Sequence, residues 1–284
     1  MSLNSRSEAL LGVGPLAAFF AVFYVLPFML LLWVSFQPQG AAQADAISLQ
    51  SYVAILADSF SLIVLADTLR LALEATLLAG LLAIPLAAYY RTAGPSARSF
   101  LIILILLPLL TSTVVRTFAW LVILGRDGVV NSSLRAAGLI DAPLHLLYSR
   151  GGLVLALAQI TLPLMVLPII NSMLRIDDRL LDASRALGAS KWRTFMQVVL
   201  PLSVPGILAG ALLSFAYAAT AFVTHTLVGG GRQIYMPLLI YQQSIGLQKW
   251  SFAAALSIIF MVAIVAIMGI VDRIVRSRMR GIDE

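Results

Sequence analysis

Apolar residues in this chain gather into long runs that short polar and charged segments separate. Each run has about the 20 residues that an α-helix needs to cross the hydrocarbon core of a bilayer. The runs do not alternate apolar and polar residues with a period of two, so transmembrane strands are not indicated. We therefore predict six membrane-spanning helices, over residues 11–36, 71–90, 100–124, 151–174, 202–228 and 251–271.

The composition is typical of a chain that has lipid as its solvent. Hydrophobic residues make up 61% of the 284 residues and charged residues 11%, and the mean hydropathy is +0.97. A water-soluble domain carries about 25% charged residues, and a disordered chain is poor in hydrophobic residues, so both classes are excluded. The chain contains no Cys and two His, so neither a thiolate nor a histidine metal site is predicted.

Basic residues are divided unequally between the two sets of connections that six spans create. Both termini and the connections after the second and fourth spans hold twelve Lys or Arg, and the opposite set holds five. Cytoplasmic loops of membrane proteins are enriched in Lys and Arg, so we predict that both termini are cytoplasmic. The arginines of the C-terminal tail are expected to anchor the last helix at the lipid surface: Arg273, Arg276, Arg278 and Arg280.

The connection between the fourth and fifth spans has the pattern of two short helices. Asp177 and Asp178 favour a helix start, Gly188 favours a left-handed helix end, and Ser190 can cap a second helix that Pro201 ends. From amphipathicity alone, the hairpin either lies on the lipid surface or docks into a groove of another protein. The second helix carries an apolar stripe at i, i+3, i+4 and i+7: Trp192, Phe195, Met196 and Val199.

The same segment contains a spaced motif. Asp182-Ala183-Ser184 is followed after three residues by Gly188, and nine more residues precede Val198-Val199-Leu200-Pro201. This spacing resembles the EAA loop of the binding-protein-dependent ABC importer permeases, which reads Glu-Ala-Ala, three residues, Gly, nine residues and Ile-x-Leu-Pro. Asp replaces Glu, Ser replaces the second Ala and Val replaces Ile. The resemblance implies a loop that inserts into a cleft of a cytosolic ATP-binding subunit through Asp182, Ala183, Ser184, Gly188, Trp192, Phe195, Leu200 and Pro201.

The resemblance extends over most of the chain and implies its fold, location and partners. The expected fold is that of a type I ABC importer permease, all-α, with six transmembrane helices and a cytoplasmic coupling helix pair in a single domain over residues 1–284. The implied location is the bacterial inner membrane. The implied partners are a second homologous permease subunit, two cytosolic ATP-binding subunits, an extracytoplasmic solute-binding protein and membrane lipid, without nucleic acid. Such a subunit is not an enzyme and holds no cofactor, since ATP and Mg bind to the partner ATPase.

Two outer segments resemble the spermidine/putrescine-type permeases in particular. One is Gly125–Asn131 followed by Leu139–Pro143, and the other is Phe222–Gly231 followed by Ile240–Gln242. A polyamine is therefore the first substrate that the resemblance implies. Permeases of the same cluster import opines, aminophosphonate-like compounds and ferric ion. An opine, amino-acid-like or aminophosphonate solute stays open as the alternative.

Charged side chains inside predicted spans are costly in lipid and are candidates for a functional role. Asp67, Arg70 and Glu74 share one helical face, on which Arg70 and Glu74 are placed to pair. They either form a structural ion pair or line the translocation path. Arg116 in the third span either faces the path or reaches towards the lipid surface. A polar stripe on the fifth span supplies either interhelical hydrogen bonds or ligand contacts: Tyr217, Thr220 and Thr224.

Other functional classes have little support in the residues. Gly229-Gly230-Gly231 lacks the GxxxxGK[ST] context of a phosphate-binding loop, so the chain is not expected to bind ATP. An intramembrane enzyme needs a nucleophile with a base, or a metal cluster, at membrane depth. A secondary transporter usually has internal repeats around a midplane ion site, and six spans are few for one. His145 and His225 are expected to be ordinary loop residues near the outer face.

Overall fold

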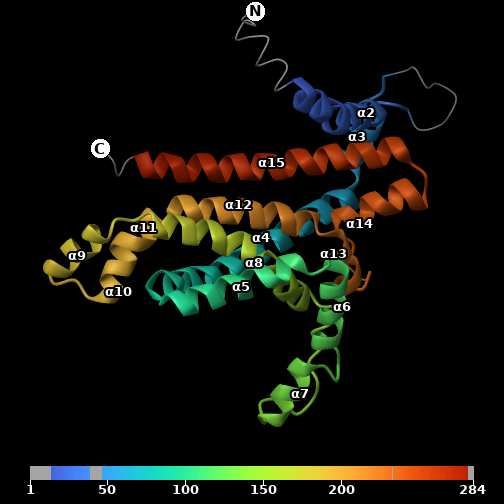
Figure 1. Cartoon of the computed structure of the whole chain (residues 1–284). Coiled ribbons are helices and arrows are strands. Elements are labelled where there is room, and N and C mark those ends of the chain that lie inside the picture. The colour runs from blue at the N-terminus through green and yellow to red at the C-terminus, as the bar shows by residue number, and fades with distance from the viewer. Residues whose placement is uncertain (1–13, 39–46, 232, 281–284) are drawn as a thin grey trace, which may run out of the picture. The chain divides into compact units, whose positions relative to one another are not determined.

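The computed structural model describes residues 14–38, 47–231 and 233–280, with the side chains of all but the last three (Figure 1). Within these ranges the regular secondary structure is helical, without strands, which confirms the predicted all-α class. The first three residues of the predicted first span, Leu11 to Val13, lie outside the described residues. The same is true of Arg6 and Arg232, which belong to the charge distribution that predicts the orientation.

The chain divides into two compact units, each of which combines two stretches of sequence. The first unit comprises the described parts of residues 1–63 and 239–263, and the second comprises those of residues 64–238 and 264–284. The candidate site described below lies in the second unit.

In the first unit, a π-helix runs directly into an α-helix. The π-helix is η1 (Ala21–Val25), and it continues as α2 (Leu26–Ser35), which α3 (Gln50–Ala57) follows. A hydrogen bond of 2.7 Å between Ser35 Oγ and the Tyr52 hydroxyl joins α2 to α3.

The described part of the chain contains four to six candidate membrane spans, against the six predicted from the sequence. Four helices are long and apolar enough to cross a bilayer alone: residues 14–35, α4 (Ser59–Thr92), α8 (Arg150–Leu174) and residues 250–277 of α15 (Trp250–Arg280). Two bent helix pairs satisfy the same criteria when each pair is taken together: residues 95–110 with 113–136, and residues 191–202 with 204–220.

The predicted third span, Phe100–Leu124, is not one continuous helix. It is divided between α5 (Pro95–Leu110) and α6 (Thr113–Leu124). The direction of the chain changes by 102° between α5 and residues 113–136, which include α7 (Val129–Ala136).

Side chains take over the hydrogen bonds that a continuous helix would make at this break. The Thr111 hydroxyl donates to the carbonyl oxygens of Leu107 and Pro108, at 3.0 and 3.1 Å. The Arg116 guanidinium donates to the carbonyls of Pro108 and Thr111. The last carbonyls of a helix need such partners, so these side chains stabilise an end to α5 inside the apolar run.

The predicted fifth span, Leu202–Val228, is also divided. The chain bends by 63° at Ser203, just before α12 (Val204–Thr220), and α13 (Phe222–Gly229) starts two residues after α12 ends. Pro205 lies in the first turn of α12, where its missing backbone N–H leaves no intrahelical hydrogen bond unmade. A proline at this place therefore favours the start of a new helix after the bend.

The core of the second unit lies where α4, α8 and α12 pack together. Small residues form the contact face of α4, because Ala79, Ala83 and Ala87 recur at i, i+4 and i+8 and are fully buried. Met165 and Ile169 of α8 belong to the same buried cluster. Small residues at a helix interface let the two backbones approach closely, which is how helices in lipid gain van der Waals contact.

The contact between α12 and α8 depends on two glycines four residues apart. Gly206 faces the turn of α8 that contains Ser172, and Gly210 faces Met165. A Cβ atom built on Gly210 would lie 2.7 Å from the carbonyl oxygen of Met165, closer than real Cβ atoms come to backbone. Both positions therefore exclude any larger residue unless the helices separate.

We expect Gly210→Val to lower the melting temperature of the purified protein, because the added atoms meet the backbone of α8. Overpacking of this kind costs about 1–3 kcal/mol. The matched control is Gly269→Val in α15, since a Cβ there meets no atom within 4 Å. Thermal unfolding in detergent, followed by circular dichroism, compares the two. Equal melting temperatures for the two variants would contradict the close approach of α12 to α8.

Candidate functional site

The polar segment after α8 folds into a hairpin of two short helices, α9 (Asp178–Ala186) and α10 (Lys191–Thr194). Asp177 caps α9, since its carboxylate accepts a hydrogen bond of 2.9 Å from the backbone N–H of Arg179. The Ser190 hydroxyl caps α10 by accepting from the N–H of Arg193 at 3.3 Å. Gly188 has a φ of +79°, the left-handed conformation that ends α9. These local features confirm the predicted helix–turn–helix.

The end of the hairpin differs from the prediction that Pro201 closes the second helix. The chain passes from α10 into the π-helix η2 (Phe195–Val199) and then into α11 (Leu200–Leu202), which contains Pro201. In the π-turn the backbone N–H of Leu200 donates to the carbonyl of Phe195. Pro201 then falls in the first turn of α11, where a missing N–H is tolerated. The bend comes two residues later.

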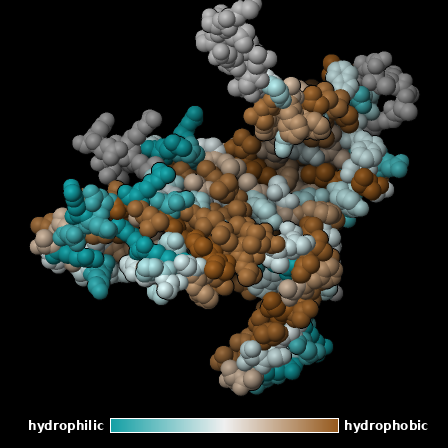
Figure 2. All heavy atoms as spheres, in the orientation of Figure 1, coloured by the Kyte–Doolittle hydropathy of each residue, from teal (hydrophilic) through white to brown (hydrophobic). Residues whose placement is uncertain are grey.

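The predicted apolar stripe of the second helix is partly buried and partly exposed. Val199 is buried against the core and Phe195 packs on the same cluster, whereas Trp192 has 68% of its surface exposed. The rings of Trp192 and Phe195 lie 6.0 Å apart. Leu187, at the turn, is 89% exposed. The tip of the hairpin thus presents two large apolar side chains, and hydrophilic side chains gather around it in Figure 2.

Side-chain contacts hold the hairpin together and fasten it to α4. The Ser184 and Thr194 hydroxyls lie 3.0 Å apart and join α9 to α10. Asp182 is exposed and pairs with Arg185 within α9, at 3.2 Å. Ala183 on the same helix is exposed, and Leu200 is half-buried.

Arg91, in the last turn of α4, makes the connection to the start of the hairpin. Its Nη2 donates to the carbonyl of Ile176 and to Asp178 Oδ1, each at 3.0 Å. Only 11% of the Arg91 side chain is exposed. One guanidinium therefore contacts both the segment that leads into α9 and the first residue of α9.

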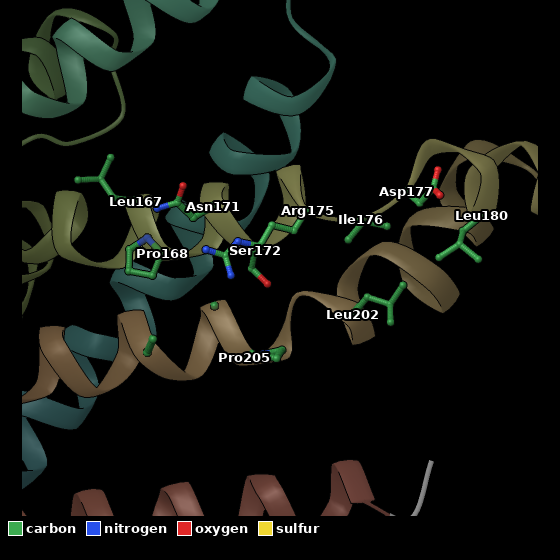
Figure 3. Close-up of a pocket in the computed structure, with 12 residues that line it drawn as sticks. Leu167, Pro168, Asn171, Ser172, Arg175, Ile176, Asp177, Leu180, Leu202 and Pro205 are labelled. Atoms are coloured by element: carbon green, nitrogen blue, oxygen red, sulfur yellow. The ribbon is translucent and has the colours of Figure 1, made fainter. Parts of the chain in front are cut away.

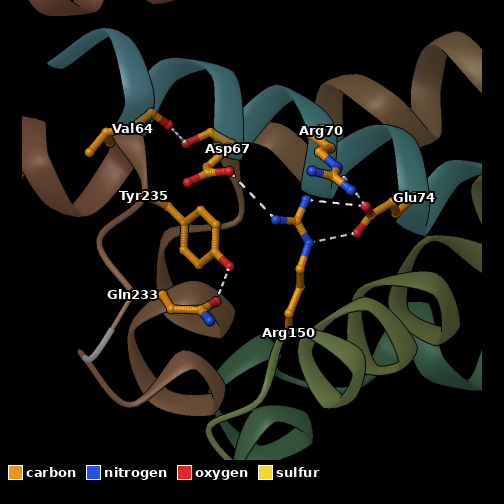
Figure 4. A network of polar contacts seen from close by, with 8 residues as sticks. Val64, Asp67, Arg70, Glu74, Arg150, Gln233 and Tyr235 are labelled. Atoms are coloured by element: carbon orange, nitrogen blue, oxygen red, sulfur yellow. Dashed lines mark hydrogen bonds and ion pairs between the residues drawn. The ribbon is translucent and has the colours of Figure 1, made fainter. Parts of the chain in front are cut away.

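A cluster of four charged side chains joins α4 to the first residue of α8 (Figure 4). Arg150 donates from Nε to Glu74 Oε2 at 2.9 Å and from Nη2 to Glu74 Oε1 at 3.2 Å. Its Nη1 lies 3.5 Å from Asp67 Oδ1. Arg70 Nε also donates to Glu74 Oε1, at 3.1 Å. Two carboxylates and two guanidinium groups make the cluster electrically neutral.

The structure brings together Asp67, Arg70 and Glu74, as their helical spacing predicts, and adds Arg150, which the predicted spans place in a loop. Arg150 directly precedes the predicted fourth span, and that position gives no sign of a partner 76 residues earlier. The signal in the sequence is the charge on this helical face, where two carboxylates share one arginine. One carboxylate therefore lacks a cationic partner on its own helix, which indicates that another segment supplies it.

Tyr235 lies beside this cluster and is buried. Its hydroxyl donates to Gln233 Oε1 at 2.6 Å. Burial raises the pKa of Tyr235 to about 12, although the nearby Arg150 guanidinium acts in the opposite direction. The phenol therefore stays protonated. His225 packs against it with 5.0 Å between the rings and is 1% exposed, so the expectation of a loop histidine is wrong at this position. A new helix, α13, starts at Phe222 after the end of α12 and carries His225 into the interior.

The predicted polar stripe of the fifth span does not form one face. Tyr217 and Thr220 are on α12, but Thr224 is on α13, after the break. Thr224 is fully buried, and its Oγ1 lies 3.4 Å from Thr117 Oγ1 of α6. Thr220 is exposed and donates to its own helix. Arg116 caps the end of α5 as described above.

An open groove of about 800 Å³ runs along the end of α8 and the start of α12 (Figure 3). Leu202 and Pro205 lie on one side of it, and Pro168, Asn171 and Arg175 lie on the other. The groove continues to Asp177 and Leu180 at the beginning of the hairpin. No three His, Asp or Glu side chains of the described residues lie close enough to hold a metal ion.

Comparisons with known proteins give one consistent result. The family described as "Binding-protein-dependent transport system inner membrane component" matches residues 15–281. The chain is 32% identical to the spermidine/putrescine transport system permease protein PotB of Escherichia coli (strain K12), over 84% of this chain and 86% of that one. It is 31% identical to the inner membrane ABC transporter permease protein YdcU of the same strain, over 93% and 88%. A chain of a bacterial alginate ABC transporter in complex with alginate pentasaccharide-bound periplasmic protein has a TM-score of 0.77 at 17% identity, over 96% and 95%.

Proposed function

The chain belongs to the family of binding-protein-dependent transport system inner membrane components, and from this premise we propose that it forms the path by which a polyamine enters the cell. Members of this family are permease subunits of ABC importers, so the chain is a transport subunit and not an enzyme, and it is embedded in the inner membrane. Its fold is that of the type I importer permeases. We propose in addition a substrate, a set of partner proteins, an orientation in the membrane, and the residues that contact the ATP-binding subunit and line the path.

The observation that carries the coupling proposal is the hairpin with its exposed apolar tip. Leu187 and Trp192 are large apolar side chains that are mostly exposed in this chain. Exposed apolar patches often mark a surface that another protein covers. They stand at the place where the spaced motif implies contact with an ATP-binding subunit. We propose that Asp182, Ala183, Ser184, Gly188, Trp192, Phe195, Leu200 and Pro201 form the contact with that subunit and transmit its movement.

In the assembled importer, two ATP-binding subunits hold ATP and Mg, and a second permease subunit completes the path. An extracytoplasmic binding protein delivers the solute. The distribution of basic residues supports cytoplasmic termini, which places the hairpin on the side where ATP is available. When the ATP-binding subunits close, the hairpin moves with them, and the spans shift between inward-facing and outward-facing arrangements.

The proposed path includes Asp67, Arg70, Glu74, Arg116, Tyr217, Thr220 and Thr224. Carboxylates favour a cationic solute, and Asp67 and Glu74 retain 48% and 32% of their side-chain surface exposed. The similarity to PotB favours spermidine and putrescine among cationic solutes. An opine, amino-acid-like or aminophosphonate solute is the alternative, for which the two arginines beside the carboxylates would supply anion contacts.

The test is ATP-driven uptake of labelled spermidine by the importer reconstituted in proteoliposomes with its binding protein. We expect uptake with the unaltered chain and loss of uptake with Trp192→Ala together with Phe195→Ala. Polyamine binding to the separate binding protein should not change, which localises the defect to coupling. If spermidine and putrescine leave the melting temperature of the binding protein unchanged and an opine or aminophosphonate raises it, the polyamine assignment is wrong. Unchanged stimulation of ATP hydrolysis in the double variant would contradict the coupling role.

A further inference from the structure

We propose that a small cavity between the hairpin and the end of α4 binds the phosphate group of an anionic phospholipid. The cavity has a volume of about 150 Å³. Since a water molecule occupies about 30 Å³ in the liquid, a group of several non-hydrogen atoms fits inside. The proposal rests on the cytoplasmic orientation proposed above, and it does not depend on which solute is transported.

Three basic side chains line the cavity: Arg91 from α4, Arg185 from α9 and Lys191 from α10. The hydroxyl-bearing Thr92 and Thr194 line it as well, and no acidic residue does. Three elements that are separated in sequence thus place cations around one space. Ammonium and guanidinium groups form short, charge-assisted hydrogen bonds with phosphate oxygens, and threonine hydroxyls add neutral ones.

The carboxylates close to this cavity neutralise the three cations only in part. Asp178 accepts from Arg91 at 3.0 Å, and Asp182 pairs with Arg185 at 3.2 Å. Within the described part of the chain, Lys191 has no ion-pair partner. The site therefore keeps an uncompensated positive charge.

An unused hydrogen-bond donor is the second observation that points to a ligand. Arg91 Nη1 is buried and has no hydrogen-bond partner, while Nη2 of the same guanidinium binds Ile176 and Asp178. A buried donor without a partner loses its hydration and gains nothing in return, which costs more at a charged group than at a neutral one. An anion in the cavity would supply the missing acceptor.

The location of the cavity favours a lipid headgroup over a soluble anion. Arg91 and Thr92 are in the last turn of α4, where this candidate span ends. Basic pockets between membrane helices at the cytoplasmic surface are sites at which anionic lipid headgroups bind. The apolar lining, which includes Leu181, Phe195 and Val199, suits the beginning of an acyl chain.

A bound headgroup would connect the two arms of the hairpin with the end of α4. Without it, the fastening consists of the Arg91 contacts to Ile176 and Asp178. With it, Arg185 and Lys191 share one anion with Arg91, so α9 and α10 are both held. Anionic lipid should then make the coupling between the ATP-binding subunits and the membrane spans more efficient.

The test uses the intact importer in phosphatidylcholine nanodiscs, with and without phosphatidylglycerol, and measures retained lipid by native mass spectrometry. Lys191→Gln should weaken phosphatidylglycerol retention about fivefold, the effect of one cation near the surface. Arg193→Gln is the matched control, because Arg193 is an exposed cation of the same helix α10 that does not line the cavity. It should retain the lipid as the unaltered chain does. In proteoliposomes of the same two lipid compositions, phosphatidylglycerol should also stimulate ATP-driven uptake by the unaltered chain and by Arg193→Gln, but not by Lys191→Gln.

Several results would overturn the proposal. Equal weakening by Lys191→Gln and Arg193→Gln would mean that the lipid binds a diffuse basic surface. Stimulation of uptake in pure phosphatidylcholine by inorganic phosphate, with no further effect of phosphatidylglycerol, would assign the cavity to a soluble anion. Loss of the ATP-binding subunits from purified Lys191→Gln would show that a protein carboxylate occupies it. Lipid retention is read without any solute, so a failure of the polyamine assignment leaves this result interpretable.

Discussion

Gly188→Val is expected to reduce the ATP hydrolysis that the binding protein stimulates in the assembled importer by roughly tenfold. Gly188 has a φ of +79°, a conformation that costs an ordinary L-residue about 1–2 kcal/mol and a β-branched residue more. Such an energy corresponds to a factor of about 5–30 in the population of the correct turn. The hairpin would then present α9 and α10 to the ATP-binding subunit at the wrong angle.

The matched control at this position is Gly188→Asn, since asparagine adopts the left-handed conformation more readily than other residues. A Cβ at residue 188 meets no atom within 4 Å, so neither variant creates a clash. Within this chain, the difference between Val and Asn therefore reports the backbone conformation. ATPase assays of the two purified complexes decide the matter: equal activity would show that the turn geometry at Gly188 is not needed for coupling.

Arg150→Met is expected to lower both the melting temperature of the protein and the rate of uptake. Arg150 makes two hydrogen bonds to Glu74 and an ion pair with Asp67. Without Arg150, Arg70 is the remaining cation beside these two carboxylates. Hydrogen bonds to charged groups contribute about 1.5–3 kcal/mol. Arg150 and Glu74 keep about a third of their side-chain surface exposed, so solvent screening places the expected loss at the lower end of this range.

A double-mutant cycle separates the loss of the ion pair from the loss of the arginine side chain. Arg150→Met leaves the Glu74 carboxylate without its main partner. Adding Glu74→Gln removes that carboxylate, so the double variant should regain part of the melting temperature that Arg150→Met loses. Arg135→Met is the control for charge, because Arg135 is an exposed arginine of α7. Thermal unfolding and spermidine uptake are measured for each variant. An Arg150→Met protein that melts and transports like Arg135→Met would contradict the structural role of the cluster.

The hairpin of α9 and α10 could be predicted from the sequence because short-range interactions determine it. The caps at Asp177 and Ser190 and the left-handed turn at Gly188 involve residues within three positions of each other. The long apolar runs that form α4, α8 and α15 are equally local signals, since their length alone indicates a membrane helix.

Features that depend on side-chain contacts across a break in a helix, or between distant segments, were not predictable. The interruption of the third predicted span requires Arg116 to reach back to the carbonyl of Pro108, and the sequence shows only an apolar run with a proline and an arginine in it. The partner of Glu74 is 76 residues away in Arg150. The interior position of His225 follows from a helix that restarts after a break, and hydrophobicity carries no signal for such a restart.

The 63° bend at Ser203 has a mechanical consequence for the importer. A displacement along residues 191–202 has its larger component perpendicular to α12, because the two helix axes differ in direction by 63°. Gly206 and Gly210 bring the backbone of α12 against α8, so this face of α12 has no room for added side-chain atoms. If the hairpin transmits movement as proposed, we expect a substitution that straightens the bend at Ser203 to change the direction in which that movement reaches α12.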